Sequence, residues 1–215
     1  VFPGMKLKPS TVGIPCPGMN LDVFDDNGKS ILQKNGYLVI KSPWPAMTRG
    51  LLNDDDRYLE NYWSRFENIW FHGDYVFVDD DGLWYMRGRT DDVINVSGHR
   101  MSTVEIEHAV IAHDKISDAA SIAIPDEITG EAIVIFFVPK NKSETISGVQ
   151  ISDYLSEKIG KIARPKAVYQ ISDLPKTRTG KIMRRLLKAK LLGLPLGDLS
   201  SLENPHVLNE ILKQD

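Results

Sequence analysis

The sequence predicts an α+β protein made of a β-rich first part and a mixed α and β second part. Up to residue 88, short apolar runs alternate with turn signals, as in antiparallel hairpins. After residue 92, helical patterns alternate with the continuous apolar runs 119–124 and 132–138, which have the length expected of buried strands. The two patterns meet in a polar stretch, residues 88–92, which reads GRTDD.

The first part is expected to begin with two short strands and a helix. The strands are predicted at 21–24 and 37–40, and Asn27-Gly28 between them is a strong turn signal. Residues 54–66 have apolar side chains at helical spacing, so we expect a helix with one apolar face. The residues expected on that face are Leu59, Tyr62, Trp63 and Phe66.

A hairpin is expected to close the first part. Its strands are predicted at 75–78 and 83–86, on either side of Asp81-Gly82. An Asp-Gly pair tolerates the positive φ angles of a tight hairpin turn, which makes this connection a specific signal.

The second part is expected to form a three-stranded central sheet with helices. Its third strand is predicted at 168–171, after the two buried runs. A final helix is predicted over 182–192, with Gly193 at its end. Two earlier helices are expected to start at capping boxes, formed by Ser102 with Glu105 and by Ser147 with Gln150.

Composition excludes several classes of protein. A net charge of −3, with 42% apolar and 26% charged residues, is typical of a globular protein and argues against a general nucleic-acid or membrane binder. The longest apolar run, 132–138, is far too short to cross a bilayer. Cys16 is the only cysteine, which excludes an intrachain disulfide and a thiolate metal site. We expect a piece of a larger cytoplasmic protein, because the chain begins with Val1 and no signal peptide is visible.

One segment departs from the mild overall charge. Residues 174–190 contain seven Lys or Arg and no acid. A solvated helix face is one interpretation of this segment, and a surface that grips a polyanion is another.

Inside the basic segment, residues 177–181 read TRTGK, which differs from a P-loop. That motif needs Gly at the position of Pro175 and Ser or Thr at the position of Ile182. Gly180 permits close backbone approach, and Lys181, expected at a helix start, adds a cation that suits phosphate or carboxylate. A solvated lysine is the alternative on local chemistry alone.

Two segments together identify a resemblance. Residues 88–100 read GRTDDVINVSGHR, and residues 175–181 read PKTRTGK. They resemble the hinge and catalytic-lysine motifs of the adenylate-forming acyl-CoA synthetases. The resemblance covers the chain from about residue 4 to residue 193. It implies formation of an acyl-AMP from a carboxylate and ATP, followed by transfer of the acyl group to CoA.

The resemblance implies a catalytic role for Lys181, which would bridge the acyl carboxylate and the α-phosphate of ATP. A fixed cation there stabilises the charge that develops during attack more than it stabilises bound substrate. Asp74 and Arg89 match the residues that bind the nucleotide ribose, and Arg100 resembles an arginine near the ATP phosphates. Taken alone, Asp74 would read as a turn residue and Arg100 as part of a surface ion pair.

The resemblance also implies a change of conformation. Asp91 matches the hinge residue about which the small domain turns, although a plain surface loop would read the same way locally. Ser97, Gly98 and His99 resemble the segment that lines the pantetheine tunnel, where a side chain at Gly98 would obstruct the thiol. A solvated ring is the local alternative for His99.

The implied organisation has four parts. Residues 1–88 are expected to be the last β-rich subdomain of the N-terminal AMP-binding domain, and residues 89–92 the hinge. Residues 93–193 would form the mobile α+β domain, and 194–215 a tail. The phosphate loop, the adenine-binding segment and the acyl pocket of the family are missing from the sequence, so the chain alone is expected to be inactive.

Two further segments indicate the acetyl- and propionyl-CoA synthetase branch. Residues 44–47 read WPAM, and residues 57–59 read RYL, ahead of Gly73-Asp74. Acetate is the expected acid, with propionate or a medium-chain or branched acid as alternatives. The branch commonly has an arginine for the 3′-phosphate of CoA where this chain has Ser156, and the alternatives for that contact are Lys158, Lys161 and Arg164.

The expected small molecules are ATP, CoA and a short-chain carboxylate, with Mg²⁺ held largely by the absent N-terminal part. No metal ligands are predicted in this chain. The expected partners are the rest of the enzyme and enzymes that acylate or deacylate Lys181, but not nucleic acid or a membrane. The alternative from another class is a non-catalytic module that binds anions or nucleic acid through residues 174–190. The sequence predicts neither the oligomeric state nor the identity of the acid.

Overall fold

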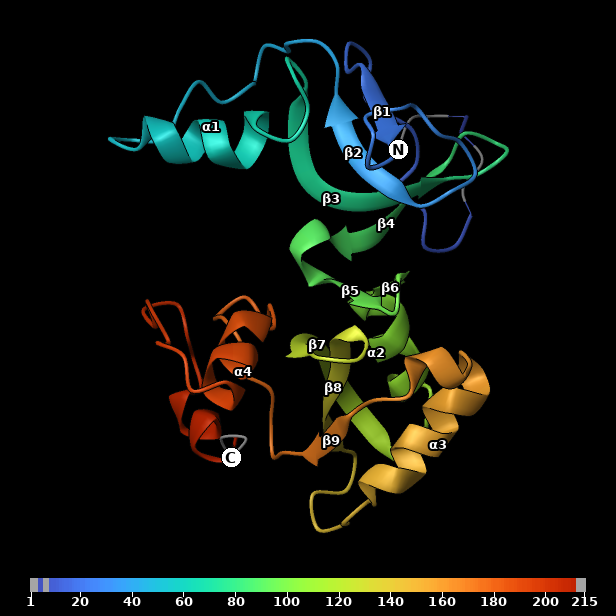
Figure 1. Cartoon of the computed structure of the whole chain (residues 1–215), viewed down its shortest axis with the longest axis vertical. Coiled ribbons are helices and arrows are strands. Elements are labelled where there is room, and N and C mark those ends of the chain that lie inside the picture. The colour runs from blue at the N-terminus through green and yellow to red at the C-terminus, as the bar shows by residue number, and fades with distance from the viewer. Residues whose placement is uncertain (1–3, 6–7, 212–215) are drawn as a thin grey trace. The chain divides into compact units, whose positions relative to one another are not determined.

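The computed structural model describes residues 4–5 and 8–211, so the ends of the predicted first part and tail, residues 1–3, 6–7 and 212–215, lie outside the described residues. The chain divides into two compact units, Val1–Asp91 and Asp92–Asp215. The division falls within the polar 89–92 segment. The predicted α+β class is confirmed, because two mainly antiparallel sheets combine with four α-helices in the described chain (Figure 1).

The first unit is a four-stranded antiparallel sheet in the order β1-β2-β3-β4. Its strands are β1 (Leu21–Phe24), β2 (Gly36–Ile40), β3 (Trp70–Val78) and β4 (Trp84–Arg89). β2 is buried along its whole length because side chains cover both of its faces. Leu38 packs with Val23 and Val76 in a small aliphatic core. Tyr37 meets the rings of Phe66 and Tyr75.

Helix α1 (Asp55–Trp63) is shorter than the predicted 54–66. It packs on the sheet through aromatic contacts with Trp70. Tyr62 stacks on Trp70 of β3 with ring centroids 4.4 Å apart, and Trp63 meets the same indole edge-on at 5.6 Å. The predicted place of Leu59 on the packed face is wrong, since Leu59 is 54% exposed. Phe66 is buried, but beyond the end of the helix. The indole of Trp70 therefore decides which side of α1 faces the sheet.

The second unit is a five-stranded sheet. Its strands are β5 (Val93–Val96), β6 (His99–Ser102), β7 (Ile116–Asp126), β8 (Gly130–Pro139) and β9 (Ala167–Gln170). β7, β8 and β9 are the three central strands that the sequence predicts, with β9 parallel to β8. The β5–β6 hairpin adds two strands to this sheet because Val96 pairs with Gly130 of β8.

Helices cover both faces of β7 and β8. They are α2 (Thr103–Ile111), α3 (Gly148–Lys158) and α4 (Arg184–Leu191), with short 3₁₀ segments at Thr90–Asp92, Lys161–Ala163 and Pro205–Asn209. In β8, Val134 and Phe136 join the core under α4, whereas Ile133 and Ile135 join the core under α2 and α3. Figure 1 shows α4 on one side of these strands and α2 and α3 on the other. The continuous apolar run in the sequence follows from this burial on two faces.

Two local expectations need correction. The last helix begins at Arg184 and not at 182, because Ile182 forms an antiparallel bridge with Lys176 and is extended there. Ser147 stands at the start of α3, but its side chain makes no capping hydrogen bond. Of the helices in the described residues, none combines the length and the apolar composition that a membrane span requires.

Candidate functional site

A bulge in β3 places the first candidate residues. Val39 of β2 pairs with Phe71, and Tyr37 pairs with Tyr75, so β3 advances four residues while β2 advances two. Three residues of β3, His72 to Asp74, therefore stand opposite one residue of β2 and leave the regular ladder with that strand, and Gly73 has a φ of +85°. Bulges of this kind redirect side chains at the edges of functional sites.

The bulge brings Asp74 and Arg89 together as cross-strand partners on β3 and β4. Nη1 of Arg89 lies 3.6 Å from Oδ1 of Asp74, and Nδ1 of His72 lies 2.5 Å from Oδ2 of the same carboxylate. The side chain of Asp74 is only 13% exposed. The carboxylate therefore has one cationic or donor group beside each of its oxygens.

Arg89 packs directly over Gly73. A Cβ atom added to Gly73 would lie 2.7 Å from Nη2 of Arg89, and Nη1 of Arg89 donates to the carbonyl of His72 at 3.4 Å. The hydroxyl of Thr90 donates to the carbonyl of Gly73 at 3.2 Å, and Nε of Arg89 lies 3.5 Å from the carboxylate of Asp91. These contacts tie the end of the first unit to the bulge.

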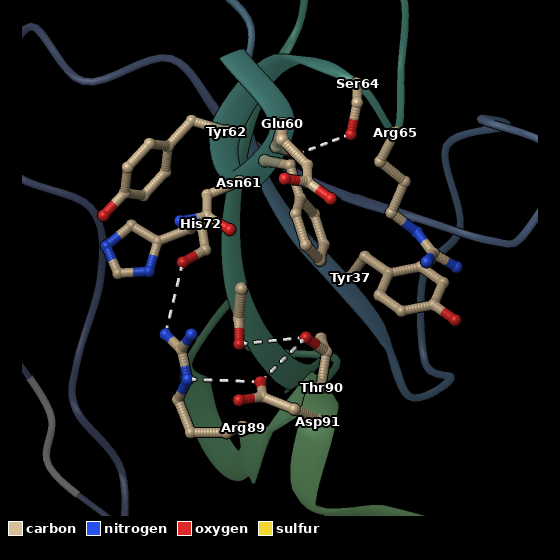
Figure 2. Close-up of a pocket in the computed structure, with 12 residues that line it drawn as sticks. Tyr37, Glu60, Asn61, Tyr62, Ser64, Arg65, His72, Arg89, Thr90 and Asp91 are labelled. Carbon is tan, nitrogen blue, oxygen red and sulfur yellow. Dashed lines mark hydrogen bonds and ion pairs between the residues drawn. The ribbon is translucent and has the colours of Figure 1, made fainter. Parts of the chain in front are cut away.

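His72, Gly73, Arg89, Thr90 and Asp91 help to line a cavity of about 720 Å³ in the first unit, whereas Asp74 is not one of its lining residues. Figure 2 shows His72, Arg89, Thr90 and Asp91 along one part of its wall, with Tyr62 nearby. The wall combines aromatic rings with charged and amide groups. Such a lining can hold an aromatic, polar ligand that carries hydroxyl groups.

The second set of candidates lies on the β5–β6 hairpin of the other unit. Val96 pairs with His99 across a two-residue loop, in which Ser97 and Gly98 have φ values of +51° and +83°. Two positive φ angles define a type I′ turn. No heavy atom lies within 4 Å of a Cβ built on Gly98. Ser97, Gly98, His99 and Arg100 are all exposed, and the two turn residues at the tip, Ser97 and Gly98, present only backbone and a small hydroxyl group to solvent.

The Lys181 loop is also a hairpin, which corrects the predicted position at a helix start. The amide of Thr177 donates to the carbonyl of Lys181 at 2.9 Å, and the amide of Gly180 donates to the carbonyl of Thr177 at 2.8 Å. The amide of Lys181 donates to the hydroxyl of Thr177 at 3.1 Å. α4 begins only at Arg184, so the exposed side chain of Lys181 stands on this loop and not on the first turn of the helix.

Ion pairs anchor both ends of the Lys181 loop to the rest of the unit. Before the loop, Nζ of Lys176 lies 2.8 Å from Asp118 of β7 and 3.2 Å from Asp173. Burial alone would lower the pKa of Lys176, but hydrogen bonds and charge from these two carboxylates raise it. After the loop, Arg184 binds Glu107 of α2. The loop therefore has limited freedom relative to the sheet.

The Arg184 contact is bidentate and mostly buried. Nε and Nη2 of Arg184 donate to the two carboxylate oxygens of Glu107 at 2.8 and 2.6 Å, and the amide of Ser121 donates to Glu107 at 2.8 Å. Nη1 of Arg184 also lies 3.8 Å from Asp92, the first residue of the second unit. Burial acts to lower the pKa of Arg184, and Glu107 outweighs it and raises the pKa.

Ser156, at the position of the expected CoA-binding arginine, bonds to its own helix. It lies on α3 and its hydroxyl donates to the carbonyl of Ser152 at 2.7 Å. Among the neighbouring cations that could replace the missing arginine, Arg164 forms an ion pair with Asp153 at 3.1 Å. Lys158 and Lys161 are exposed.

The predicted site residues thus fall into two groups. Asp74, Arg89 and Asp91 come together in the first unit, and the other predicted residues belong to the second unit, namely Ser97, Gly98, His99, Arg100 and Lys181. Sequence reasoning missed His72 and the Glu107–Arg184 pair. The spacing of His72 and Asp74, two residues apart on a strand, was an available signal, whereas no local signal links residues 77 apart.

Comparison with known proteins gives one family match and several relatives. Residues 105–181 match the family described as the AMP-binding enzyme C-terminal domain. The chain is 43% identical to the acetyl-coenzyme A synthetase of Pyrobaculum arsenaticum over 98% of its own length. That match covers 32% of the relative, so the chain spans about one third of the length of the curated proteins it matches.

Solved structures agree with this match. The acetoacetyl-CoA synthetase from Streptomyces lividans aligns with a TM-score of 0.79 and 25% identity, covering 93% of this chain and 31% of that one. The anthranilate CoA ligase AuaEII, in complex with anthranoyl-AMP, aligns with a TM-score of 0.71 and 29% identity, covering 87% and 36%. Each of these two proteins is about three times longer than the part that aligns.

Proposed function

We propose that this chain is the C-terminal part of an AMP-forming acyl-CoA synthetase, because residues 105–181 match the AMP-binding enzyme C-terminal domain family. Acetate is the first choice of substrate, since the relatives at 40–43% identity over nearly the whole chain include acetyl-CoA synthetases. Propionate and medium-chain or branched acids remain the alternatives. The observation that carries the proposal is the presence of both motifs, residues 88–100 and 175–181, in one chain. Their candidate residues lie on hairpins or beside the β3 bulge, and the chain divides into its two units at Asp91/Asp92.

In the first half-reaction, an oxygen of the carboxylate attacks the α-phosphorus of ATP and pyrophosphate leaves. We assign Lys181 to the negative charge that grows on the α-phosphoryl oxygens. Asp74 accepts hydrogen bonds from the ribose hydroxyls, and Arg89 contacts the ribose beside it. Arg100 contributes positive charge near the phosphates. The exposure of Lys181 and the anchored loop that carries it support this assignment.

In the second half-reaction, the CoA thiolate attacks the acyl carbon and AMP leaves. We propose that the second unit turns about Asp91 between the two steps, which withdraws Lys181 and presents Ser97, Gly98 and His99 to the pantetheine arm. The exposed type I′ turn supports a tunnel role, because Gly98 adds no side chain to the hairpin tip. Lys158, Lys161 and Arg164 are the candidates for the CoA phosphate in place of an arginine at Ser156.

ATP is taken as its magnesium complex, with the ion held by the nucleotide and by the N-terminal part of the enzyme. Within residues 4–5 and 8–211, no group of three His, Cys, Asp or Glu side chains is arranged to hold a metal ion. A cytoplasmic location and acylation of the exposed Lys181 stay predictions from the sequence.

The polyanion-binding alternative has less support. Three of the seven cations in residues 174–190 are engaged inside the unit: Lys176 and Arg184 in ion pairs, and Arg185 with the carbonyls of Leu196 and Asp198. Those side chains contribute less to binding phosphates outside the unit. A binding module would show steep salt dependence with nucleic acid, which a synthetase would not need.

The test is acid-dependent exchange of pyrophosphate into ATP by the complete protein, with acetate, propionate, butyrate and longer acids. Lys181→Ala should lower exchange by a factor of about 10²–10³ and largely spare CoA transfer from supplied acetyl-AMP. Arg178→Ala, which removes an exposed cation from the same loop, is the matched control and should change neither step. Equal losses in both half-reactions for Lys181→Ala would contradict the two-conformation assignment.

A further inference from the structure

The bulge that carries Asp74 also carries His72, which has no part in the proposed function so far. Its ring lines the cavity of the first unit, and its side chain is 45% exposed. Of the two residues, only Asp74 belongs to the motif, yet the 2.5 Å contact makes His72 a direct partner of that carboxylate. We propose that His72 is a positioning residue, which holds the Asp74 carboxylate in the orientation that receives the ribose hydroxyls. This inference rests on the proposed function.

The chemistry of the contact assigns the ring tautomer. An ionised carboxylate can only accept hydrogen bonds, so Nδ1 of His72 must carry the proton that it donates to Oδ2 of Asp74. In the neutral ring, Nε2 is then an acceptor. The Nδ1 bond uses one of the roughly four lone-pair directions of the carboxylate, which leaves others for two ribose hydroxyls.

The neighbouring guanidinium makes this bond important. Nη1 of Arg89 lies 3.6 Å from Oδ1 of Asp74, which is too long for a good hydrogen bond. A small rotation of the carboxylate would close that gap and form a direct salt bridge that competes with the ribose for acceptor sites. The bond from His72 to the other oxygen opposes this rotation. Arg89 itself is held by the carbonyl of His72 and by packing on Gly73, contacts that do not need the imidazole.

The bulge explains how one short segment supplies both groups. Residues two apart on a strand point to the same face, and the positive φ of Gly73 tilts His72 and Asp74 toward each other. A regular strand in this place would keep the two side chains parallel. The backbone geometry and the His-Gly-Asp sequence are therefore matched to each other.

The experiment compares nucleotide binding by the complete protein and its variants, with ATP, 2′-deoxy-ATP and 3′-deoxy-ATP as titrants. His72→Ala should weaken ATP binding about tenfold, as expected for loss of one charge-assisted hydrogen bond. It should weaken binding of the deoxynucleotides less, because they already lack one of the hydroxyls. His72→Asn, whose amide N–H can replace Nδ1–H, should restore binding and discrimination to within about threefold of the wild type. His206→Ala, on an exposed histidine of the second unit, is the matched control.

The outcomes separate the inference from the function it rests on. If the wild-type protein binds no ATP, or if Asp74→Asn leaves ATP binding unchanged, the proposed ribose site fails. If Asp74→Asn weakens binding while His72→Ala binds and discriminates like the wild type, only the role of His72 is overturned. The role is also overturned if His72→Asn fails to rescue, or if the loss in His72→Ala is equal for all three nucleotides. Thermal unfolding followed by circular dichroism checks that each variant stays folded.

Discussion

Removing one partner of the Glu107–Arg184 pair should strongly destabilise the second unit. The side chains of Glu107 and Arg184 are only 7% and 19% exposed, so water replaces little of their interaction. Arg184→Met removes two of the three hydrogen bonds described for Glu107 and leaves its carboxylate with the amide of Ser121. Breaking a buried pair by removing one partner costs about 3–5 kcal/mol. We expect a loss of about 3 kcal/mol, at the lower end because Arg184 retains some contact with water.

The assay can follow the two units separately. All four tryptophans, Trp44, Trp63, Trp70 and Trp84, lie in the first unit, whereas far-UV circular dichroism reports on both. With a urea m-value of about 2 kcal/mol per molar, the loss corresponds to a midpoint shift of about 1.5 M. That shift should occur in the dichroism transition of the second unit, and the fluorescence midpoint should stay unchanged.

A double variant tests the physical reason for the loss. Glu107→Gln combined with Arg184→Met removes the charge that the single variant leaves buried, so it should be more stable than Arg184→Met alone. The reasoning is refuted if the loss of unfolding free energy in the double variant equals the sum of the losses in the two single variants. It is also refuted if Arg184→Met shifts the midpoint by less than about 0.3 M, the value expected of a surface ion pair.

Two further predictions concern backbone geometry and pH. Gly73→Ala should destabilise the first unit, seen as an earlier tryptophan transition, by more than Gly98→Ala destabilises the second unit, seen by dichroism. Both glycines have a positive φ, but only Gly73 would place its Cβ 2.7 Å from Arg89; equal losses would show that the contact is unimportant. The pKa of Asp126 is lowered first by the hydrogen bond from Lys166 and then by hydrogen bonds from Thr129 and Ile128. The ionised Asp126 carboxylate therefore stabilises the folded protein above the unfolded pKa near 4, and this stabilisation is lost as the pH falls below that value. Asp126→Asn should therefore be less stable than the wild type at pH 7, with the gap closing toward pH 2 in urea titrations; a gap that stays constant with pH would contradict this origin.

The pattern of apolar residues along the sequence predicted the central strands of the second unit. The runs 119–124 and 132–138 became the centres of β7 and β8 because side chains alternate faces along a strand, and both faces are covered. The Asp-Gly hairpin and the β-rich start of the chain were likewise readable from turn chemistry. The motif residues could be named individually through the resemblance to the adenylate-forming acyl-CoA synthetases, because local chemistry alone left structural alternatives open.

The sequence by itself determined the α+β class, the main strands, the polar division near residue 91 and the candidates Asp74, Arg89 and Lys181. Tertiary structure decided their surroundings. Lys181 stands on a hairpin because Lys176 and Ile182 pair across it, and Arg184 is anchored by a glutamate 77 residues away. The bulge that turns His72 toward Asp74 depends on the register between β2 and β3. The spacing of apolar residues in the sequence indicates only which face of a single strand or helix is buried. Strand register and ion pairing depend on which distant segments of the chain come into contact.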